Sequence, residues 1–250
     1  MKKIVIIGAN DFQNQLILKA KEMGFETHVF AWQDGSIGER TADYFYPVSI
    51  VEIDEILEKC KEIKPDAVAT IASDLANITV SKVAAGLGLP GNTPECIEIS
   101  TNKYAMRSAF AHAGIPTPAF YKVDQVQDEL YKMKLPIIVK PTDRSGSRAI
   151  TKITDFKDLE AAIKDAVEQS FEKKAIVEEY IEGNEYSYET ISYRGKHTNL
   201  AVTKKYTTGA PHFIETGHCE PSDLSEEMLK KVHKTMYAAL DALQITDGAS

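Results

Sequence analysis

The first ninety residues alternate apolar strand patterns with amphipathic helix patterns, which limits the possible folds more than any other feature of the sequence. Strands are expected at 3–7, 26–31, 44–48 and 67–71, and helices at 12–23, 53–63 and 75–87. Repeated strand–helix–strand units form parallel sheets with right-handed crossovers. Such sheets bind ligands at the carboxyl ends of their strands. Residues 8–10 and 73–74 are therefore expected at the ligand-binding edge of a parallel sheet.

The second part of the chain follows a segment rich in turn-forming residues, 88–94. Glycine and proline concentrated between two patterned regions mark a domain boundary, so we expect domains at 1–93 and 94–250. Beyond the boundary, strands are expected at 137–140, 149–153, 176–181, 186–193, 200–206 and 212–215, and helices at 101–113, 158–170 and 224–243. Consecutive strands with few helices favour an α+β domain with an antiparallel sheet.

Net charge and cysteine content limit which partners and which cell compartment are expected. The chain carries 29 Lys and Arg against 37 Asp and Glu, a net charge of −8, and such a surface repels phosphate backbones at long range. Three scattered cysteines without a C-x-x-C pair are typical of a reducing cytosol. The apolar start stops at Gly8, too early for a signal peptide or a membrane span. We expect a soluble cytoplasmic protein that binds neither nucleic acid nor membrane; a homodimer stays open.

The first strand–helix turn argues against a nicotinamide cofactor. This turn has only one glycine, Gly8, whereas close approach of a pyrophosphate needs more. A literal G-x-G-x-x-G match at 86–91 ends a helix instead of opening one, and it contains Pro90. An oxidoreductase is therefore the weaker of the enzyme hypotheses.

A lysine, Lys140, ends the apolar strand at 137–140, and a small polar loop with two arginines and a glycine follows it. Burying an ammonium is costly unless an anion meets it. Backbone N–H groups of such a loop can surround phosphate oxygens, and Gly146 permits the positive φ of a tight hairpin. The pattern indicates a phosphate site; the alternative is an exposed hairpin whose lysine reaches solvent.

The stretch 175–187 has the features of a nucleoside site. Apolar residues lead into acidic and aromatic residues, then a glycine turn, then Glu185. An adenine ring needs an apolar slot with a backbone donor and acceptor at its edge, which the linker at 179–181 supplies, and ribose hydroxyls suit a carboxylate such as Glu185. The alternative is an edge hairpin with solvated glutamates.

Together these patterns resemble the ATP-grasp superfamily from residue 92 to the C-terminus, and within it the carboxylate–amine ligases of the carbamoyl-phosphate-synthase-like and L-amino-acid-ligase type. The motif at 101–107 and the Gly-x-Pro-x-Pro at 114–118 match the start of that domain. The preceding segment is similar to the Rossmann-like, parallel-sheet domain that usually precedes it. The resemblance implies an α/β protein with a pre-ATP-grasp domain followed by an α+β ATP-grasp domain.

The resemblance also implies roles for individual residues. Catalysis would fall to Lys140 and Arg144, and substrate contacts to Glu215, His218 and, more weakly, Asp74. His218 is equally well explained as a strand-end histidine, and Asp74 as a helix cap. The residues implied in ATP binding are Lys103, Lys140, Ser145, Gly146, Ser147, Glu178, Glu179, Tyr180, Ile181 and Glu185.

The implied reaction is ATP-dependent ligation of a small-molecule carboxylate to an amine, amino acids among them, through an acyl phosphate, with ATP and Mg²⁺ as cofactors. The alternative is an ATP-binding module or regulatory fragment without catalysis. In the family the Mg²⁺ carboxylates lie in late strands, and the one Glu-x-Asn here, 182–184, falls in the adenine linker. We therefore expect a C-terminally truncated, catalytically incomplete ATP-grasp domain whose metal ligands lie beyond Ser250.

Overall fold

The computed structural model describes residues 1–249. The chain divides into two compact units, Met1–Glu98 and Ile99–Ser250. The division falls inside helix α5 (Pro94–Thr101), a few residues beyond the boundary predicted from the turn-rich segment. No helix within residues 1–249 is both long enough and apolar enough to cross a membrane.

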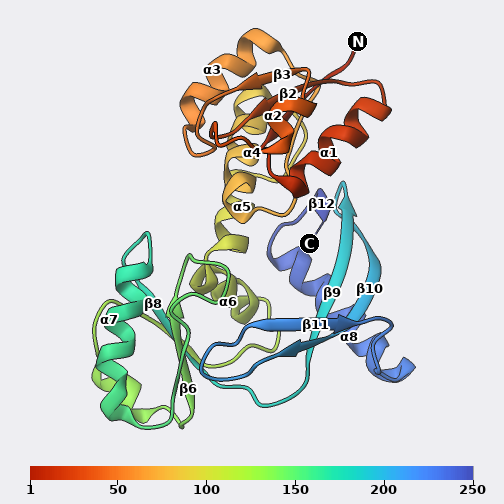
Figure 1. Ribbon diagram of the computed structural model, residues 1–250. Helices are drawn as coiled ribbons and strands as arrows, with labels where there is room; N and C mark the ends of the chain where they lie inside the picture. The colour runs from red at the N-terminus through yellow and green to blue at the C-terminus, as the bar shows by residue number, and fades with distance from the viewer. Residues whose placement is uncertain (250) are drawn as a thin grey trace. The chain divides into compact units, whose positions relative to one another are not determined.

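The first unit is built on a parallel four-stranded sheet with the order β3-β2-β1-β4, which confirms the predicted parallel sheet. Helix α1 packs on one face, and α3 and α4 pack on the other (Figure 1). Because successive strand residues point to opposite faces, Ile4 and Ile6 lie under α1, whereas Val5 and Ile7 lie under α3 and α4. The elements are β1 (Lys3–Ile7), α1 (Asp11–Glu22), β2 (Glu26–Phe30), α2 (Ile37–Thr41), β3 (Tyr44–Tyr46), α3 (Ile53–Ile63), β4 (Ala67–Ala69) and α4 (Asp74–Leu87).

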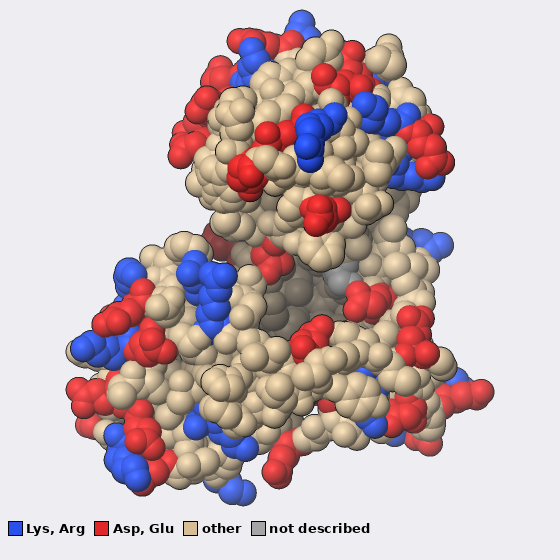
Figure 2. Space-filling view, viewed as in Figure 1, with Lys and Arg blue, Asp and Glu red and all other residues tan. Residues whose placement is uncertain are grey.

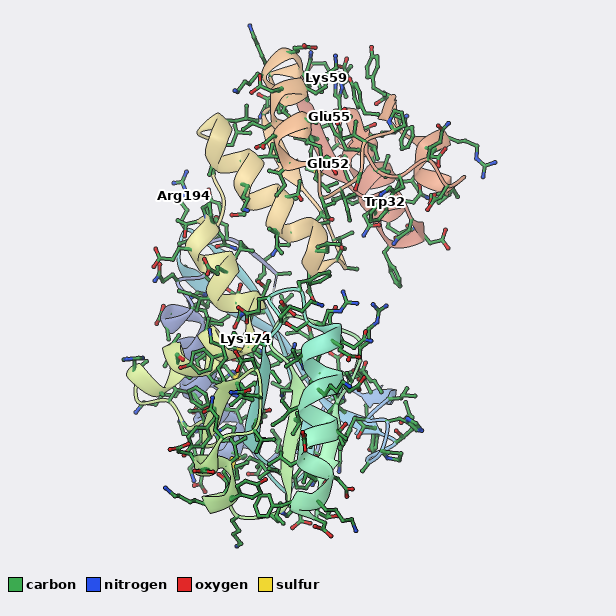
Figure 3. All side chains as sticks on the ribbon, turned by 90° about the vertical axis from the view of Figure 1, so that its left-hand side faces the viewer. Trp32, Glu52, Glu55, Lys59, Lys174 and Arg194 are labelled. Carbon is green, nitrogen blue, oxygen red and sulfur yellow. The ribbon has the colours of Figure 1, made fainter. Side chains whose placement is uncertain are left out.

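The carboxyl edge of this sheet is fixed by hydrogen bonds between its turns. The Asn10 side chain caps α1, and Gln13 closes a capping box with it. The Gln13 side-chain amide also donates to the Ile71 carbonyl, which ties the turn after β1 to the turn after β4. Trp32, labelled in Figure 3, follows β2 and is half exposed.

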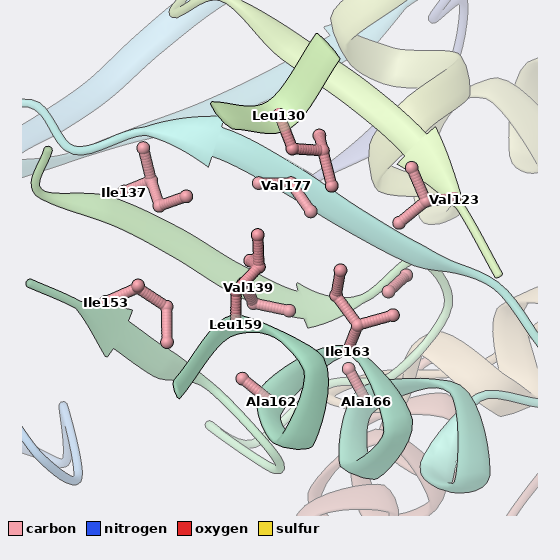
Figure 4. Packing of buried hydrophobic residues seen from close by; sticks show 11 residues of the cluster. Val123, Leu130, Ile137, Val139, Ile153, Leu159, Ala162, Ile163, Ala166 and Val177 are labelled. Atoms are coloured by element: carbon pink, nitrogen blue, oxygen red, sulfur yellow. The ribbon is translucent and has the colours of Figure 1, made fainter. Parts of the chain in front are cut away.

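The second unit contains two antiparallel sheets. The first has the order β5-β8-β6-β7, and helix α7 covers one of its faces (Figure 1). Side chains from all four strands and from α7 form its core, with Val139, Val177 and Ile163 at the centre (Figure 4). The elements are β5 (Phe120–Val123), the 3₁₀ helix Asp128–Lys132, β6 (Ile137–Pro141), β7 (Thr151–Ile153), the 3₁₀ helix Phe156–Asp158, α7 (Leu159–Gln169) and β8 (Ala175–Glu179).

The second sheet has the order β11-β10-β9-β12. Helix α8 packs on one face of it, where Tyr188 of β9 is hydrogen-bonded to His233. Helix α6 contacts both β5 and α8. The elements are α6 (Lys103–His112), β9 (Glu185–Tyr193), β10 (Lys196–Thr207), β11 (Glu215–Cys219), α8 (Glu226–Ala242) and β12 (Gly248–Ala249).

The strand predicted at 212–215 is wrong. Residues 212–214 belong to a loop, and β11 begins at Glu215. The loop is closed by two backbone hydrogen bonds, from Thr208 to the Ile214 carbonyl and from Phe213 to the Gly209 carbonyl, each 2.8 Å long. Phe213 has a φ of +50°, so its backbone is left-handed and cannot continue a strand. The prediction rested on two consecutive apolar residues, Phe213 and Ile214, which lie in the loop.

Candidate functional site

Three charged side chains meet on the β5-β8-β6-β7 sheet of the second unit, on the face that α7 does not cover. Val139 and Val177 point into the core under α7, so their neighbours Lys140 and Glu178 point to the opposite face. Lys140 Nζ forms an ion pair with Glu178 Oε1, and Arg107 Nε of α6 donates to Glu178 Oε2 at 3.0 Å. The Glu178 carboxylate is almost fully buried, and both cations are mostly buried.

The electrostatics of this cluster favour an anion. Burial by itself raises the pKa of Glu178, but the positive charges of Lys140 and Arg107 outweigh it and hold that pKa below its ordinary value. The carboxylate is therefore ionised at neutral pH. Two cations then face one carboxylate, which leaves one positive charge to be balanced. On the face shown in Figure 2, by contrast, Lys and Arg are interspersed with Asp and Glu.

The predicted phosphate loop begins directly after this cluster. Its first residues are held in place: the Lys103 backbone N–H donates to the Thr142 carbonyl at 2.7 Å, and Lys103 Nζ donates to the Arg144 carbonyl. Ser145, Gly146 and Ser147 are exposed at its tip. Both Gly146 and Ser147 have positive φ values, 73° and 55°, as a tight turn requires. Lys103 is thus brought to the loop that follows Lys140.

The predicted adenine linker lies at the far end of the same strand pair. Glu179 is opposite Ile137, three residues along β6 from Lys140. The Tyr180 backbone N–H donates to the Pro136 carbonyl at 3.3 Å, and Lys152 Nζ lies 3.6 Å from the centre of the Tyr180 ring. Ile181, the last linker residue, is 62% exposed. The strand pair therefore carries the Lys140 cluster at one end and the exposed linker at the other.

A second charged cluster lies on the β9-β10-β11 sheet. Lys205 of β10 is opposite both Glu185 and His218, because the register pairs it with each. Its Nζ lies 3.1 Å from Glu215 Oε2 and 3.9 Å from Glu185 Oε2. His218 Nε2 lies 2.6 Å from Glu215 Oε1. Hydrogen bonds from His218 and Lys205 lower the pKa of Glu215.

Three of the predicted site residues therefore gather around a lysine that the sequence reasoning missed. Lys205 lies in a strand that was predicted, but only the strand register brings it to Glu185 and Glu215. Arg107 was missed as well. Its spacing of four residues from Lys103 places both on one face of a helix, and that signal was available in the sequence.

Asp74 is the one predicted site residue in the first unit. It begins α4 at the carboxyl edge of the parallel sheet. The N-cap is Ser73, whose Oγ accepts from the Ala76 backbone N–H at 3.2 Å. The capping role that competed with a substrate role for Asp74 is therefore taken by its neighbour.

Within residues 1–249, no group of three or more His, Cys, Asp or Glu side chains is arranged to hold a metal ion. The acidic side chains of the two clusters are instead paired with cations, as described above. The described side chains therefore form no acidic cluster that would hold a metal ion without a nucleotide.

Comparison with known proteins agrees with this architecture. Residues 133–250 match the family model described as the ATP-grasp domain. The chain is 28% identical over 224 residues to alanine–anticapsin ligase of Bacillus subtilis (strain 168), covering 79% of this chain and 47% of the relative. Among solved structures, an L-amino acid ligase from Bacillus licheniformis superposes with a TM-score of 0.86 at 25% identity, covering 100% of this chain and 62% of the other.

A purK N5-carboxyaminoimidazole ribonucleotide synthetase, solved as an ADP complex, has the same fold, with a TM-score of 0.84 at 19% identity over 99% of this chain and 64% of the other. Residues 133–250, which lie within the second unit, thus match the ATP-grasp domain. The predicted fold class and superfamily are confirmed. The chain spans about half the length of the curated relative, 47%.

Proposed function

We propose that the second unit binds ATP along β6, with the purine at residues 179–181 and the phosphates at Lys140. The strand geometry supports this orientation. Lys140 is three residues from the position opposite Glu179, about 10 Å at the usual rise of an extended strand. That separation suits a purine at one end and a phosphate chain at the other.

The observation that carries the proposal is the buried group formed by Lys140, Arg107 and Glu178. Buried cations in excess of their carboxylate partners need an anion, and a phosphate chain supplies one in the right place. The buried Arg144 Nε also has no hydrogen-bond partner within residues 1–249, so a further donor is available for a phosphate oxygen. Glu178 then acts by holding Lys140 and Arg107 in position.

We further propose that the chain takes part in ATP-dependent ligation of a carboxylate to an amine, with amino acids as the first substrate class to test. A carboxylate oxygen attacks the γ-phosphorus of ATP, the bond to ADP breaks, and an acyl phosphate forms. The amine nitrogen then attacks the acyl carbon, the bond to phosphate breaks, and the amine loses a proton. Lys140 and Arg144 would neutralise the charge that develops during phosphoryl transfer.

The cluster on the second sheet is proposed for the ribose and the acceptor substrate. Glu185 would accept from ribose hydroxyls, and Glu215 would hold the ammonium of an amine. The hydrogen bonds from His218 and Lys205 that lower the pKa of Glu215 also hold its carboxylate in place. Lys205, which lies between the two carboxylates, would offset their mutual repulsion and hold them in position. The loop tip at Ser145, Gly146 and Ser147 would close over the phosphates.

Mg²⁺ is part of the resemblance. No cluster of three or more acidic side chains within residues 1–249 would hold it, so the nucleotide phosphates would supply most of its ligands. A second candidate function is an ATP-binding module without catalysis of its own. Nucleotide binding needs only the cation cluster and the linker, both of which lie within residues 1–249.

Two measurements separate these candidates. Calorimetric titration of ATP and ADP into the wild-type chain and the Lys140→Ala variant tests nucleotide binding; equal binding by both would contradict the proposed site. A screen of carboxylate–amine pairs for phosphate release then tests ligation. Release that depends on both substrates supports the ligase, whereas nucleotide binding without release supports the module.

A further inference from the structure

The turn between α7 and β8, residues 171–174, anchors three consecutive residues at the start of the phosphate loop. The register places Pro141 opposite Ala175, so the turn faces the loop. The Thr142 backbone N–H and Oγ1 both donate to the Lys174 carbonyl, at 3.3 and 3.2 Å. Lys174, labelled in Figure 3, is itself paired with Asp124.

Asp143 makes the second tie. One of its carboxylate oxygens accepts from the Phe171 backbone N–H at 3.0 Å, and the other accepts from the Glu172 backbone N–H at 2.7 Å. Glu172 in turn accepts from the Asn102 side chain at 2.8 Å, at the cap of α6. The turn, the loop and the start of α6 are therefore joined in one hydrogen-bonded network.

Arg144 makes the third tie, through its side chain. Its guanidinium carbon lies 4.3 Å from the centre of the Phe171 ring, and its carbonyl accepts from Lys103 Nζ. Phe171 is 65% exposed, so its ring serves no apolar core; what it contacts is the guanidinium. Arg144 Nε is nevertheless buried and lacks a hydrogen-bond partner within residues 1–249. The stacking thus holds a buried donor in place without satisfying it.

We infer that Phe171 is a positioning residue that holds the Arg144 guanidinium ready for the outer phosphates of the nucleotide, so that the site discriminates by phosphate-chain length. The inference rests on the proposed ATP site. Arg144 follows Lys140 by four residues, beyond the end of β6 and on the side away from the linker. A guanidinium there would reach the β- and γ-phosphates, which are far from the purine and which AMP lacks.

The test compares Phe171→Leu with Phe171→Tyr in calorimetric titrations of ATP and AMP. Leucine keeps an apolar side chain but removes the ring, so ATP affinity should fall about two- to fivefold, the factor that a cation–π contact at a partly exposed site is worth. AMP affinity should not change. Tyrosine keeps the ring face and should restore ATP affinity to the wild-type value. A merely structural role for Phe171 would weaken ATP and AMP alike.

A double-mutant cycle provides the stricter condition. If Phe171 acts through Arg144, the leucine substitution should cause no further loss of ATP affinity in an Arg144→Ala background. The same loss in both backgrounds, or no loss in the wild-type background, overturns the inference and leaves the proposed ATP site standing. Failure of the wild-type chain to bind ATP overturns both.

Discussion

The Lys140 ammonium and the Glu178 carboxylate form an ion pair across two neighbouring antiparallel strands, on the face opposite the core. The pair is diagonal: Lys140 is in register with Ile176, and Glu178 with Ile138. Arg107 completes it from α6. The lysine balances a buried carboxylate, and in the proposed site it would have a second role, to offer charge to a phosphate.

The substitution Lys140→Ala should affect both roles. Loss of a charged phosphate contact should weaken ADP binding by about tenfold or more. The fold should also lose about 1–3 kcal/mol, less than for a fully unpaired buried charge because Arg107 still faces Glu178. Calorimetry and thermal unfolding measure the two effects. The exposed Lys134→Ala is the matched control and should change neither.

Glu178 should make stability dependent on pH in the acid range. Its pKa is lower in the folded chain than in the unfolded chain, so the unfolded state binds its proton first as the pH falls. The stabilisation is complete above the unfolded-state pKa, about 4.3, and is lost as the pH falls toward the folded-state value. The midpoint of thermal unfolding between pH 6 and pH 3, compared with that of Glu178→Gln, reports this term. An identical pH slope in the variant would show that another group carries it.

Glu185→Gln should reduce discrimination between ATP and 2′-deoxy-ATP. The side chain is half exposed and lies 3.9 Å from Lys205, so it is free to turn toward a ribose. Loss of one charged hydrogen-bonding group should cost on the order of 1–3 kcal/mol of ATP binding and little of 2′-deoxy-ATP binding. Glu189→Gln, an exposed change on the same strand, is the control. Unchanged discrimination would remove Glu185 from the ribose site.

Lys205→Met should disturb the acceptor side of the site. Glu215 would lose the Lys205 contact that helps to lower its pKa, so that pKa should rise. If Glu215 holds an ammonium in the position that Lys205 gives it, loss of that position should raise the KM for the amine while ADP affinity changes less. Steady-state kinetics over a range of amine concentrations checks this. Lys196→Met, at the exposed start of the same strand, should leave the KM unchanged.

Removal of Mg²⁺ should have a small effect on ADP binding by this chain. The residues 1–249 offer no acidic cluster for the ion, so the metal would be held mainly by the nucleotide itself. The ADP dissociation constants in Mg²⁺ and in EDTA should therefore differ by less than about tenfold. A much larger dependence would place metal ligands within these residues.

The sequence predicted the positions of helices and strands better than it predicted which strands pair. The parallel sheet of the first unit followed from its alternating strand and helix patterns, although these patterns do not specify that β4 pairs with β1. The strand β5 was missed because it has only four residues and directly follows a proline-rich segment, and α5 was missed because it begins at Pro94 inside a turn-rich segment. Secondary-structure propensity alone does not identify either element.

The same holds for the candidate site: single residues were identified from the sequence, but their contacts were not. Lys140 and Glu178 were both identified, but as separate contacts to ATP, and only the register of β6 and β8 joins them. Lys205 was missed because its neighbours come from β9 and β11, whose pairing no local pattern specifies. The anchoring of Arg144 on Phe171 depends on a turn 27 positions farther along the chain and has no sequence signal.

The order β5-β8-β6-β7 also has a consequence for synthesis. Strand β8 is central in this sheet but is the last of its four strands to be made. A growing chain emerging from the ribosome therefore exposes β6, with Lys140 lacking its counter-ion, until a carboxylate 38 residues later has left the exit tunnel. In the first unit the last strand to be made, β4, lies at an edge of the sheet, so the other three strands can pair before it emerges. A pause in translation after β7 would prolong the stage at which the nascent second unit is most exposed to misfolding.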